Sequence, residues 1–307
     1  MPEIELRAVR LSDEAGQLEA ELVPAAGMLC RSLRHRGEEL LSQNAGALAY
    51  AQSGKTMGIP LLYPWANRLA GFRYSVGGRT VQIPRDDQRV RTDAGGLPIH
   101  GVIGGRMSWK LEDRNERSLA ASLSWSEDSP ELFELFPFRH DLRYSARLLD
   151  GRLQIELEVS ACGPDRVPLS FGFHPYLTLP GEARERWRVQ LPAMRALALD
   201  ARQIPAGPAQ TLGPQRFQLE RRQLDDGFDG VAEPARFSVE GAGRRIELTF
   251  LRGYPCAQVF APASPQCICF EPMTAPTNAL SSGEGLRLLA PGQRFAAGFS
   301  VTVAQPG

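Results

Sequence analysis

Four short polar motifs interrupt the apolar stretches of this chain and carry most of its candidate chemistry. They are Asn67-Arg68, His100-Gly101, His174-Pro-Tyr176 and Glu271-Pro272. The chain has only 4 histidines in 307 residues, and two of them stand in these motifs. A neutral imidazole, a carboxylate and an arginine held in one cleft suit proton transfer on a hydroxyl group at neutral pH.

His174 and Glu271 are the strongest candidates for that proton transfer. His174 follows an apolar run and precedes Pro175, which forces extended backbone geometry at the histidine and favours a side chain that points into a cleft. Glu271 ends another apolar run, where alternation places it on the same strand face as Cys267 and Cys269. A buried glutamate tends toward a raised pKa unless it is paired, which suits a general base. The alternative is a glutamate that accepts hydrogen bonds from loop amides.

The other polar motifs are interpreted as binding positions, each with a structural alternative. Arg68 offers a rigid fork of donors for vicinal hydroxyls or a carboxylate, or else for loop carbonyls. Gly101 lets the backbone turn sharply after His100. A lone histidine is more often a satisfied core or surface group, and His35 and His140 take that interpretation. The pair Asp225-Asp226, followed by glycine, is also typical of a turn.

Composition excludes several classes of protein. Basic and acidic residues number 35 each, so no excess positive charge favours a nucleic-acid or membrane partner. No apolar run predicts a transmembrane helix, and residues 1–5 lack a signal pattern. The 5 scattered cysteines do not predict a disulfide framework, and a cytoplasmic location is expected. Cys267 and Cys269 lack zinc-site spacing and no dinucleotide loop is present, so neither a metal nor another cofactor is expected.

Alternating polar and apolar residues between turns predict an all-β protein. Residues 72–76 and 79–83 read as a hairpin closed by Gly77-Gly78, and residues 143–149 and 152–159 as a second closed by Asp150-Gly151. A third hairpin is expected through residues 241–243. Helix signals are few: Ser129-Pro130 predicts one start, and Pro137 ends it after about two turns. We expect one large antiparallel β-sandwich domain over residues 1–307.

Taken together, the motifs resemble the aldose 1-epimerase (galactose mutarotase) family. The matching segments follow the family's order from about residue 58 to 295: Asn67-Arg68, His100-Gly101, His174-Pro-Tyr176, Asp225-Asp226-Gly-Phe228, Glu271-Pro272 and Leu288-Leu-Ala-Pro-Gly292. The resemblance implies a mutarotase-like β-sandwich with an open sugar cleft. It implies that the chain interconverts the α and β anomers of a free hexose, as a cytoplasmic monomer or homodimer without a cofactor.

The resemblance also implies roles for individual residues. His174 corresponds to the family's general acid and Glu271 to its general base. Arg68, with Asn67 before it, His100 and Asp225 correspond to sugar-binding positions. Two departures from the family pattern bear on substrate preference rather than on the chemistry. Asp226 stands where the family often has His or Asn, so that either aspartate is a candidate binder, and Thr178 stands where galactose enzymes often carry Asn.

Three alternatives remain open from the sequence. A hexose-6-phosphate 1-epimerase would need a phosphate clamp, for which Arg73, Arg91 and Arg106 are candidates. A non-catalytic sugar-binding protein would stack aromatic side chains such as Trp65 and Tyr176 on the ring. A glycosidase would use Asp225 and Glu271 as paired carboxylates.

Overall fold

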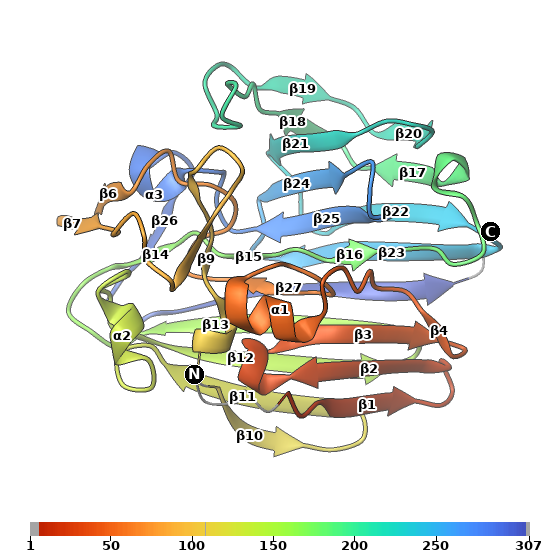
Figure 1. Ribbon diagram of the computed structural model, residues 1–307, viewed down its shortest axis with the longest axis horizontal. Coiled ribbons are helices and arrows are strands. Elements are labelled where there is room, and N and C mark those ends of the chain that lie inside the picture. The colour runs from red at the N-terminus through yellow and green to blue at the C-terminus, as the bar shows by residue number, and fades with distance from the viewer. Residues whose placement is uncertain (1–5, 108, 305–307) are drawn as a thin grey trace.

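The protein is built from two large antiparallel sheets that share one apolar core, as the alternating patterns predict (Figure 1). The computed structural model describes residues 6–107 and 109–304. Ile155 and Leu157 of one sheet and Val259 and Phe270 of the other belong to the same core cluster and are almost fully buried. The all-β prediction is therefore confirmed.

The first sheet has nine strands, and its order mixes the middle of the chain with its C-terminal part. In sheet order they are β10 (Lys110–Arg114), β11 (Ser118–Ser124), β12 (His140–Leu149), β13 (Arg152–Ala161), β27 (Arg294–Ala304), β23 (Arg244–Arg252), β22 (Ala235–Gly241), β17 (Arg188–Leu191) and β20 (Gln215–Gln218).

The second sheet has eight strands, and it carries the polar residues that follow as a candidate site. Its order is β19 (Gln210–Leu212), β18 (Met194–Ala196), β21 (Leu224–Asp229), β24 (Cys256–Ala261), β25 (Ile268–Met273), β15 (Gly172–Phe173) and β5 (Leu61–Leu62), with β16 (Tyr176–Leu177) also paired to β25. A four-stranded sheet contains β1 (Val9–Asp13), β2 (Leu18–Val23), β3 (Leu29–His35) and β4 (Glu38–Glu39). The single bridge Leu41–Leu177 joins the segment after β4 to β16.

Smaller elements cap the sheets, and several gather at the left end of Figure 1. Three strand pairs are β6 (Arg73–Val76) with β7 (Arg79–Gln82), β8 (Val90–Thr92) with β9 (Pro98–Val102), and β14 (Val167–Leu169) with β26 (Arg287–Leu289). The short helices are α1 (Ala47–Ser53), α2 (Pro130–Phe133) and α3 (Ala279–Ser282), and the 3₁₀ turns are η1 (Pro24–Ala26), η2 (Gly104–Arg106) and η3 (Arg184–Arg186).

The predicted hairpins are present, and the residues at their turns have the backbone geometry that such turns require. Asp150 and Gly151 between β12 and β13 both have positive φ (53° and 67°), as a primed two-residue turn requires. Gly77 and Gly78 between β6 and β7 behave in the same way. The third hairpin differs slightly, because Gly241 still belongs to β22 and residues 242–243 alone make the turn.

The helical prediction was wrong in length. The helix after Ser129 is α2, a single turn of four residues instead of about two turns, and the Ser129 side chain makes no capping hydrogen bond. Leu135, Phe136 and Phe138 follow it and are buried in the core. After Phe133 the backbone N–H groups of Leu135 and Phe136 bond carbonyls three residues back, as in successive turns, and Pro137 disfavours helical geometry at the residue before it.

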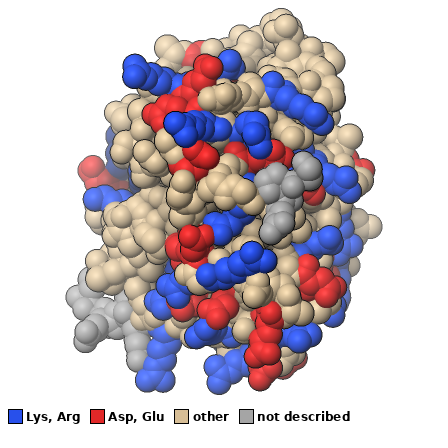
Figure 2. Space-filling model, turned by 90° about the vertical axis from the view of Figure 1, so that its right-hand side faces the viewer, with Lys and Arg blue, Asp and Glu red and all other residues tan. Residues whose placement is uncertain are grey.

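The surface charge is mixed on the face of the molecule that Figure 2 shows. On the face in Figure 2 basic and acidic side chains are interspersed, without a field of one sign. Among the residues that the structure describes, no helix is both long and apolar enough to cross a bilayer.

Candidate active site

A cleft beside β25, β24 and β21 gathers every site residue that the motifs predict. Its cavity has a volume of about 230 Å³, the scale of a single small ligand. Loops before β6 and around β8–β9 close its other side. The predicted residues that line it are Asn67, Arg68, His100, His174, Asp225 and Glu271.

His174 and Glu271 meet directly in this cleft, although they lie far apart in the sequence. The distance between His174 Nε2 and Glu271 Oε1 is 3.1 Å, and both side chains are nearly inaccessible to solvent (5% and 2% exposed). His174 lies between β15 and β16, both of which pair with β25, the strand of Glu271. Strand pairing therefore fixes the contact between the two groups.

The imidazole of His174 is held by aromatic packing. It stacks on Tyr176 with ring centroids 4.2 Å apart and planes 8° apart, and Phe260 packs against it edge-on. The Tyr176 hydroxyl lies 3.3 Å from His174 Nε2 and 2.6 Å from Thr56 Oγ1. The ring is thus fixed in orientation before any ligand binds, which favours positioned proton transfer.

Burial shifts both members of the pair toward their neutral forms. It lowers the pKa of His174 to about 3 and raises the pKa of Glu271 well above 4.5. For Glu271 the nearby charge of Asp225 raises the pKa further, and Arg68 opposes this. The direction of the Glu271 shift is the one expected of a buried glutamate. Moving one proton across the 3.1 Å contact would convert this neutral pair into an ion pair.

Arg68 reaches the cleft between two carboxylates. Its Nε donates to Asp93 at 2.7 Å, and its other nitrogens lie 3.0 Å from Asn67 Oδ1 and 3.6 Å from Asp225 Oδ2. Asp93 also accepts the backbone N–H groups of Gly95 and Leu97 through Oδ1. Asp93 is thus a rigid acceptor that points the guanidinium toward the cavity.

We expect Asp93→Asn to weaken substrate binding. The amide keeps an acceptor for the two loop N–H groups but removes the ionic partner of Arg68, and a hydrogen bond to a charged group contributes about 1.5–3 kcal/mol. KM should rise about ten-fold or more, with a smaller change in kcat, when sugar turnover is followed at several concentrations. An unchanged KM would show that Arg68 does not depend on Asp93.

His100 owes its position to the glycine that follows it. Both residues have positive φ (65° and 73°), and the His100 N–H donates to the carbonyl of Asn67 at 2.9 Å. A β-carbon on Gly101 would lie 2.0 Å from the Tyr63 carbonyl oxygen. The close approach of two backbones therefore requires glycine here.

Gly101→Ala should both destabilise the fold and displace His100. The methyl group cannot occupy its site, so the segment must move, and we expect a loss of about 1–3 kcal/mol in the free energy of unfolding together with lower kcat/KM. Gly78→Ala is the matched control, because Gly78 also has positive φ (76°) but has no atom within 4 Å of the added carbon. Equal behaviour of the two variants in thermal unfolding would contradict the steric argument.

Asp225, rather than Asp226, faces the cleft. Asp225 accepts a 2.7 Å hydrogen bond from Gln258 Nε2, whereas Asp226 is exposed and does not line the cavity. Gln258 pairs with Glu271 across β24 and β25, so it stands between the two acids. Sequence reasoning missed Gln258, although a lone amide inside the apolar run of β24 was a signal. It also missed Thr56 and Asp93, for which no comparable pattern exists.

Several buried polar atoms of the cleft have no partner within the described part of the protein. They are His100 Nδ1, His174 Nδ1, Gln258 Oε1 and Glu271 Oε2. Buried polar atoms are normally hydrogen-bonded. A polyhydroxylated ligand would supply both donors and acceptors to these positions.

Other residues considered from the sequence lie elsewhere. Trp65 is fully buried in the core, so it cannot stack on a sugar ring. Of the three arginines proposed for a phosphate clamp, Arg91 lines the cleft and Arg73 and Arg106 do not. His140 is a buried core residue bonded to Tyr63 and Phe138, as expected. Cys267 and Cys269 are free and buried.

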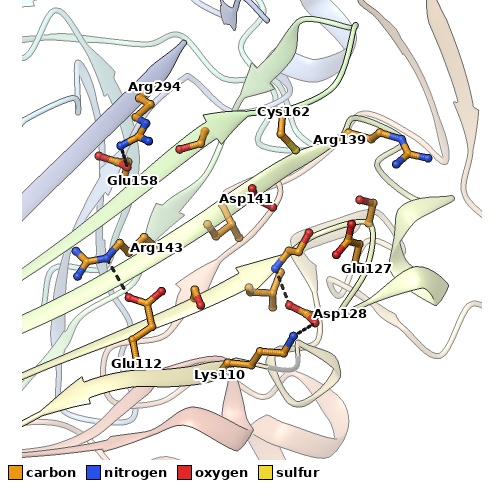
Figure 3. A pocket seen from close by; sticks show the side chains of 16 residues that line it. Lys110, Glu112, Glu127, Asp128, Arg139, Asp141, Arg143, Glu158, Cys162 and Arg294 are labelled. Atoms are coloured by element: carbon orange, nitrogen blue, oxygen red, sulfur yellow. Dashed lines mark hydrogen bonds and ion pairs between the residues drawn. The ribbon is translucent and has the colours of Figure 1, made fainter. Parts of the chain in front are cut away.

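A larger hollow on the nine-stranded sheet lacks this chemistry. It measures about 650 Å³ and is lined from β10 to β13 and β27 (Figure 3). Six of its charged residues form the ion pairs Lys110–Asp128, Arg143–Glu112 and Arg294–Glu158, at 2.5, 3.1 and 3.6 Å. None of the described residues that line it is a histidine. The smaller cleft is therefore the candidate active site.

Comparison with known proteins agrees with the fold and the motifs. The model of the aldose 1-epimerase family matches residues 23–302, so the chain belongs to this family. The uncharacterized protein YihR of Escherichia coli K12 is 25% identical over 242 residues, covering 76% of this chain and 75% of the relative.

Solved structures share the fold at low sequence identity. A galactose mutarotase-like protein from Clostridium acetobutylicum superposes with a TM-score of 0.82 at 18% identity, covering 98% of this chain and 96% of that one. The Slr1438 protein from Synechocystis sp. PCC 6803 gives 0.78 at 24% identity, covering 98% and 97%. A putative aldose 1-epimerase from Escherichia coli K12 gives 0.76 at 20% identity, covering 98% and 100%. At these identities the likeness establishes the fold alone.

Proposed function

We propose that this protein catalyses the interconversion of the α and β anomers of a hexose by opening and reclosing the pyranose ring. One observation carries the proposal: His174 Nε2 and Glu271 Oε1 lie 3.1 Å apart in a small cleft rich in unpartnered polar atoms. A cyclic hemiacetal needs a proton removed from its anomeric hydroxyl and a proton delivered to its ring oxygen. These two oxygens are bonded to one carbon, so adjacent proton carriers match them.

The reaction conserves the single proton of the pair. In the ion-pair form, Glu271 takes the proton from the anomeric hydroxyl while His174 gives its proton to the ring oxygen. The C1–O5 bond then breaks and an open-chain aldehyde forms. Rotation about C1–C2 exposes the other face of the carbonyl, and reclosure with reversed proton transfers returns both groups to their starting states. Arg68, His100 and Asp225 would hold the sugar hydroxyls during this exchange.

Polarimetry tests the function. Freshly dissolved α-glucose and α-galactose should reach their equilibrium rotation faster with the protein than with buffer alone or with the Glu271→Gln variant. Saturable sugar binding without faster mutarotation would indicate a binding protein instead. Release of reducing ends from a glycoside would indicate a glycosidase.

A hexose 6-phosphate is a second candidate substrate for the same reaction. Arg91 lines the cleft, and its guanidinium bonds the Gly54 carbonyl at 3.2 Å. Its positive charge adds to burial in lowering the pKa values of His100 and His174, so it acts inside the cleft, where an anion would bind. Glucose 6-phosphate belongs in the same polarimetric series, and Arg91→Gln should raise KM for the phosphate ester alone if the phosphate binds there.

The shifted pKa values predict a broad plateau in the pH profile of kcat/KM. Because the imidazole pKa is lowered to about 3, the acid limb should appear near that pH, and the raised carboxyl pKa moves the alkaline limb well above 4.5. Between these limits the pair holds one proton and should remain active. Rates measured from acid to alkaline pH, corrected for the uncatalysed reaction, check this. A narrow optimum between 4.5 and 6.5, the ordinary values of the two groups, would contradict it.

A further inference from the structure

The strand that carries Glu271 continues into a mostly buried segment, residues 274–278. This segment hydrogen-bonds both to the residues before His174 and to the loop of Arg68. Thr274 is its first residue and is 4% exposed. Its N–H and its hydroxyl both donate to the carbonyl of Phe171, at 2.9 and 3.1 Å. Phe171 lies three residues before His174. One end of the segment is therefore hydrogen-bonded to the residue that precedes β15 and His174.

Asn278, at the other end, is fastened to the loop of Arg68. Its N–H donates to the carbonyl of Arg68 at 2.9 Å, and its Oδ1 accepts the N–H of Ala70 at 2.8 Å. Asn278 adopts left-handed geometry with φ of 68°, which asparagine tolerates better than most residues. A strained backbone beside a site persists only where surrounding contacts hold it.

This segment adds a direct link between two parts of the site. The sheet already links them at the start of the Arg68 loop, where the Ala66 N–H donates to Ser170 at 2.6 Å and Ala66 packs with Met273 of β25. The Arg68 loop is also bonded to β9, through Leu69 N–H to Pro98 and His100 N–H to Asn67. Those bonds set the loop against His100 but not against Glu271. Among the described residues, the two Asn278 bonds are the hydrogen bonds between residues 66–70 and residues 271–278. They hold the part of the loop from Arg68 to Ala70 against the segment that follows the strand of Glu271.

We propose that residues 274–278 form a positioning strap that sets Arg68 relative to Glu271, and that Asn278 is the positioning residue through which the strap acts. The proposal rests on the proposed mutarotation and on Arg68 as a substrate-binding group. The Oδ1 atom of Asn278 matters because the Ala70 N–H has no acceptor without it. The loop that carries Arg68 can then move away from residues 274–278. Asp93 holds the guanidinium of Arg68, whereas Asn278 holds the backbone of its loop.

Steady-state kinetics on the full-length protein test the strap with three variants of one residue. Asn278→Ala removes the acceptor and adds strain, Asn278→Gly removes the acceptor but keeps left-handed geometry free of strain, and Asn278→Asp keeps both. We expect KM for the hexose to rise about ten-fold in Asn278→Ala and Asn278→Gly with kcat within about three-fold, and to return toward the wild-type value in Asn278→Asp. Wild-type KM in Asn278→Gly would overturn the proposal, even if Asn278→Ala does not fold.

A double-mutant cycle separates action through Arg68 from a general loss of structure. If Asn278 acts through Arg68, Asn278→Gly should add nothing to the KM of Arg68→Ala, whereas independent effects would multiply and overturn the proposal. Gln203→Ala is the matched control, because Gln203 is also left-handed (φ 63°) and does not line the cleft. It should leave KM unchanged. If the wild-type protein had no mutarotase activity, the proposed function would be refuted. That outcome differs from failure of the strap proposal, in which the wild type is active and Asn278→Gly keeps the wild-type KM.

Discussion

Glu271→Gln is expected to lower kcat for mutarotation by about 10²–10⁴-fold, the usual contribution of one positioned proton carrier. Gln has nearly the shape of Glu and can still meet the Nε2 atom of His174, but it can neither take nor return a proton. KM should change little, because the sugar hydroxyls remain bound by other groups. Initial rates from polarimetry at saturating sugar measure the effect.

The same variant should fold and should be at least as stable as the wild type at neutral pH. Burial raises the pKa of Glu271 above 4.5, so between that pH and the raised value the folded protein binds a proton that the unfolded chain releases. The free energy of unfolding of the wild type therefore falls as the pH rises above 4.5. A glutamine side chain does not titrate, so the advantage of the variant in thermal unfolding should grow from acid to neutral pH.

Glu240→Gln provides the matched control. Glu240 is also a buried glutamate, but it lies on β22 of the nine-stranded sheet and pairs with Arg188 and Arg245 at 3.4 and 3.5 Å. Its substitution should leave kcat near the wild-type value. If Glu271→Gln kept kcat within about ten-fold of the wild type while folded, Glu271 would not be a proton carrier in this reaction.

The fold and the candidate residue Glu271 could be predicted because each depends on local patterns. Leu153 and Ile155 alternate with polar residues, and such alternation specifies one buried face of β13 without knowledge of its neighbours. Glu271 was recognisable because a carboxylate at the end of an apolar strand has no packing purpose. The resemblance to a family then related it to His174, a pairing that the sequence alone does not contain.

The supporting residues could not be predicted because their roles arise only from tertiary contacts. Asp93 lies in a glycine-containing loop and looks like ordinary turn chemistry, yet it aligns Arg68. Asn278 reads as a loop asparagine until β25 brings it against Ala70. The lowered pKa of His174 could not be predicted for a similar reason, since the extent of burial around this imidazole depends on its aromatic neighbours. Motifs thus reveal groups that react, and the fold reveals what holds them.

His174→Phe and His140→Phe should have opposite effects, although both histidines are buried. Burial lowers the pKa of each, to about 3 for His174 and about 4 for His140, so neither pKa by itself marks the catalytic residue. Their partners differ: His174 meets Glu271 in the cleft, whereas His140 stacks on Trp125 and bonds the Tyr63 hydroxyl in the core.

We expect His174→Phe to fold, because a phenyl ring can stack on Tyr176, and to lose about 10²–10⁴-fold in kcat because no proton reaches the ring oxygen. His140→Phe should keep most of its activity but unfold more easily by about 1–3 kcal/mol, since the buried Tyr63 hydroxyl loses its partner. Below pH 6.5 both imidazoles take up protons in the unfolded chain but stay neutral in the folded protein, so the free energy of unfolding of the wild type falls as the pH is lowered. Each variant lacks one of these imidazoles, so its free energy of unfolding should fall less over the same pH range. Polarimetry and thermal unfolding of both variants measure this contrast. An active His174→Phe protein, or a well-folded but inactive His140→Phe protein, would show that His174 is not the proton donor.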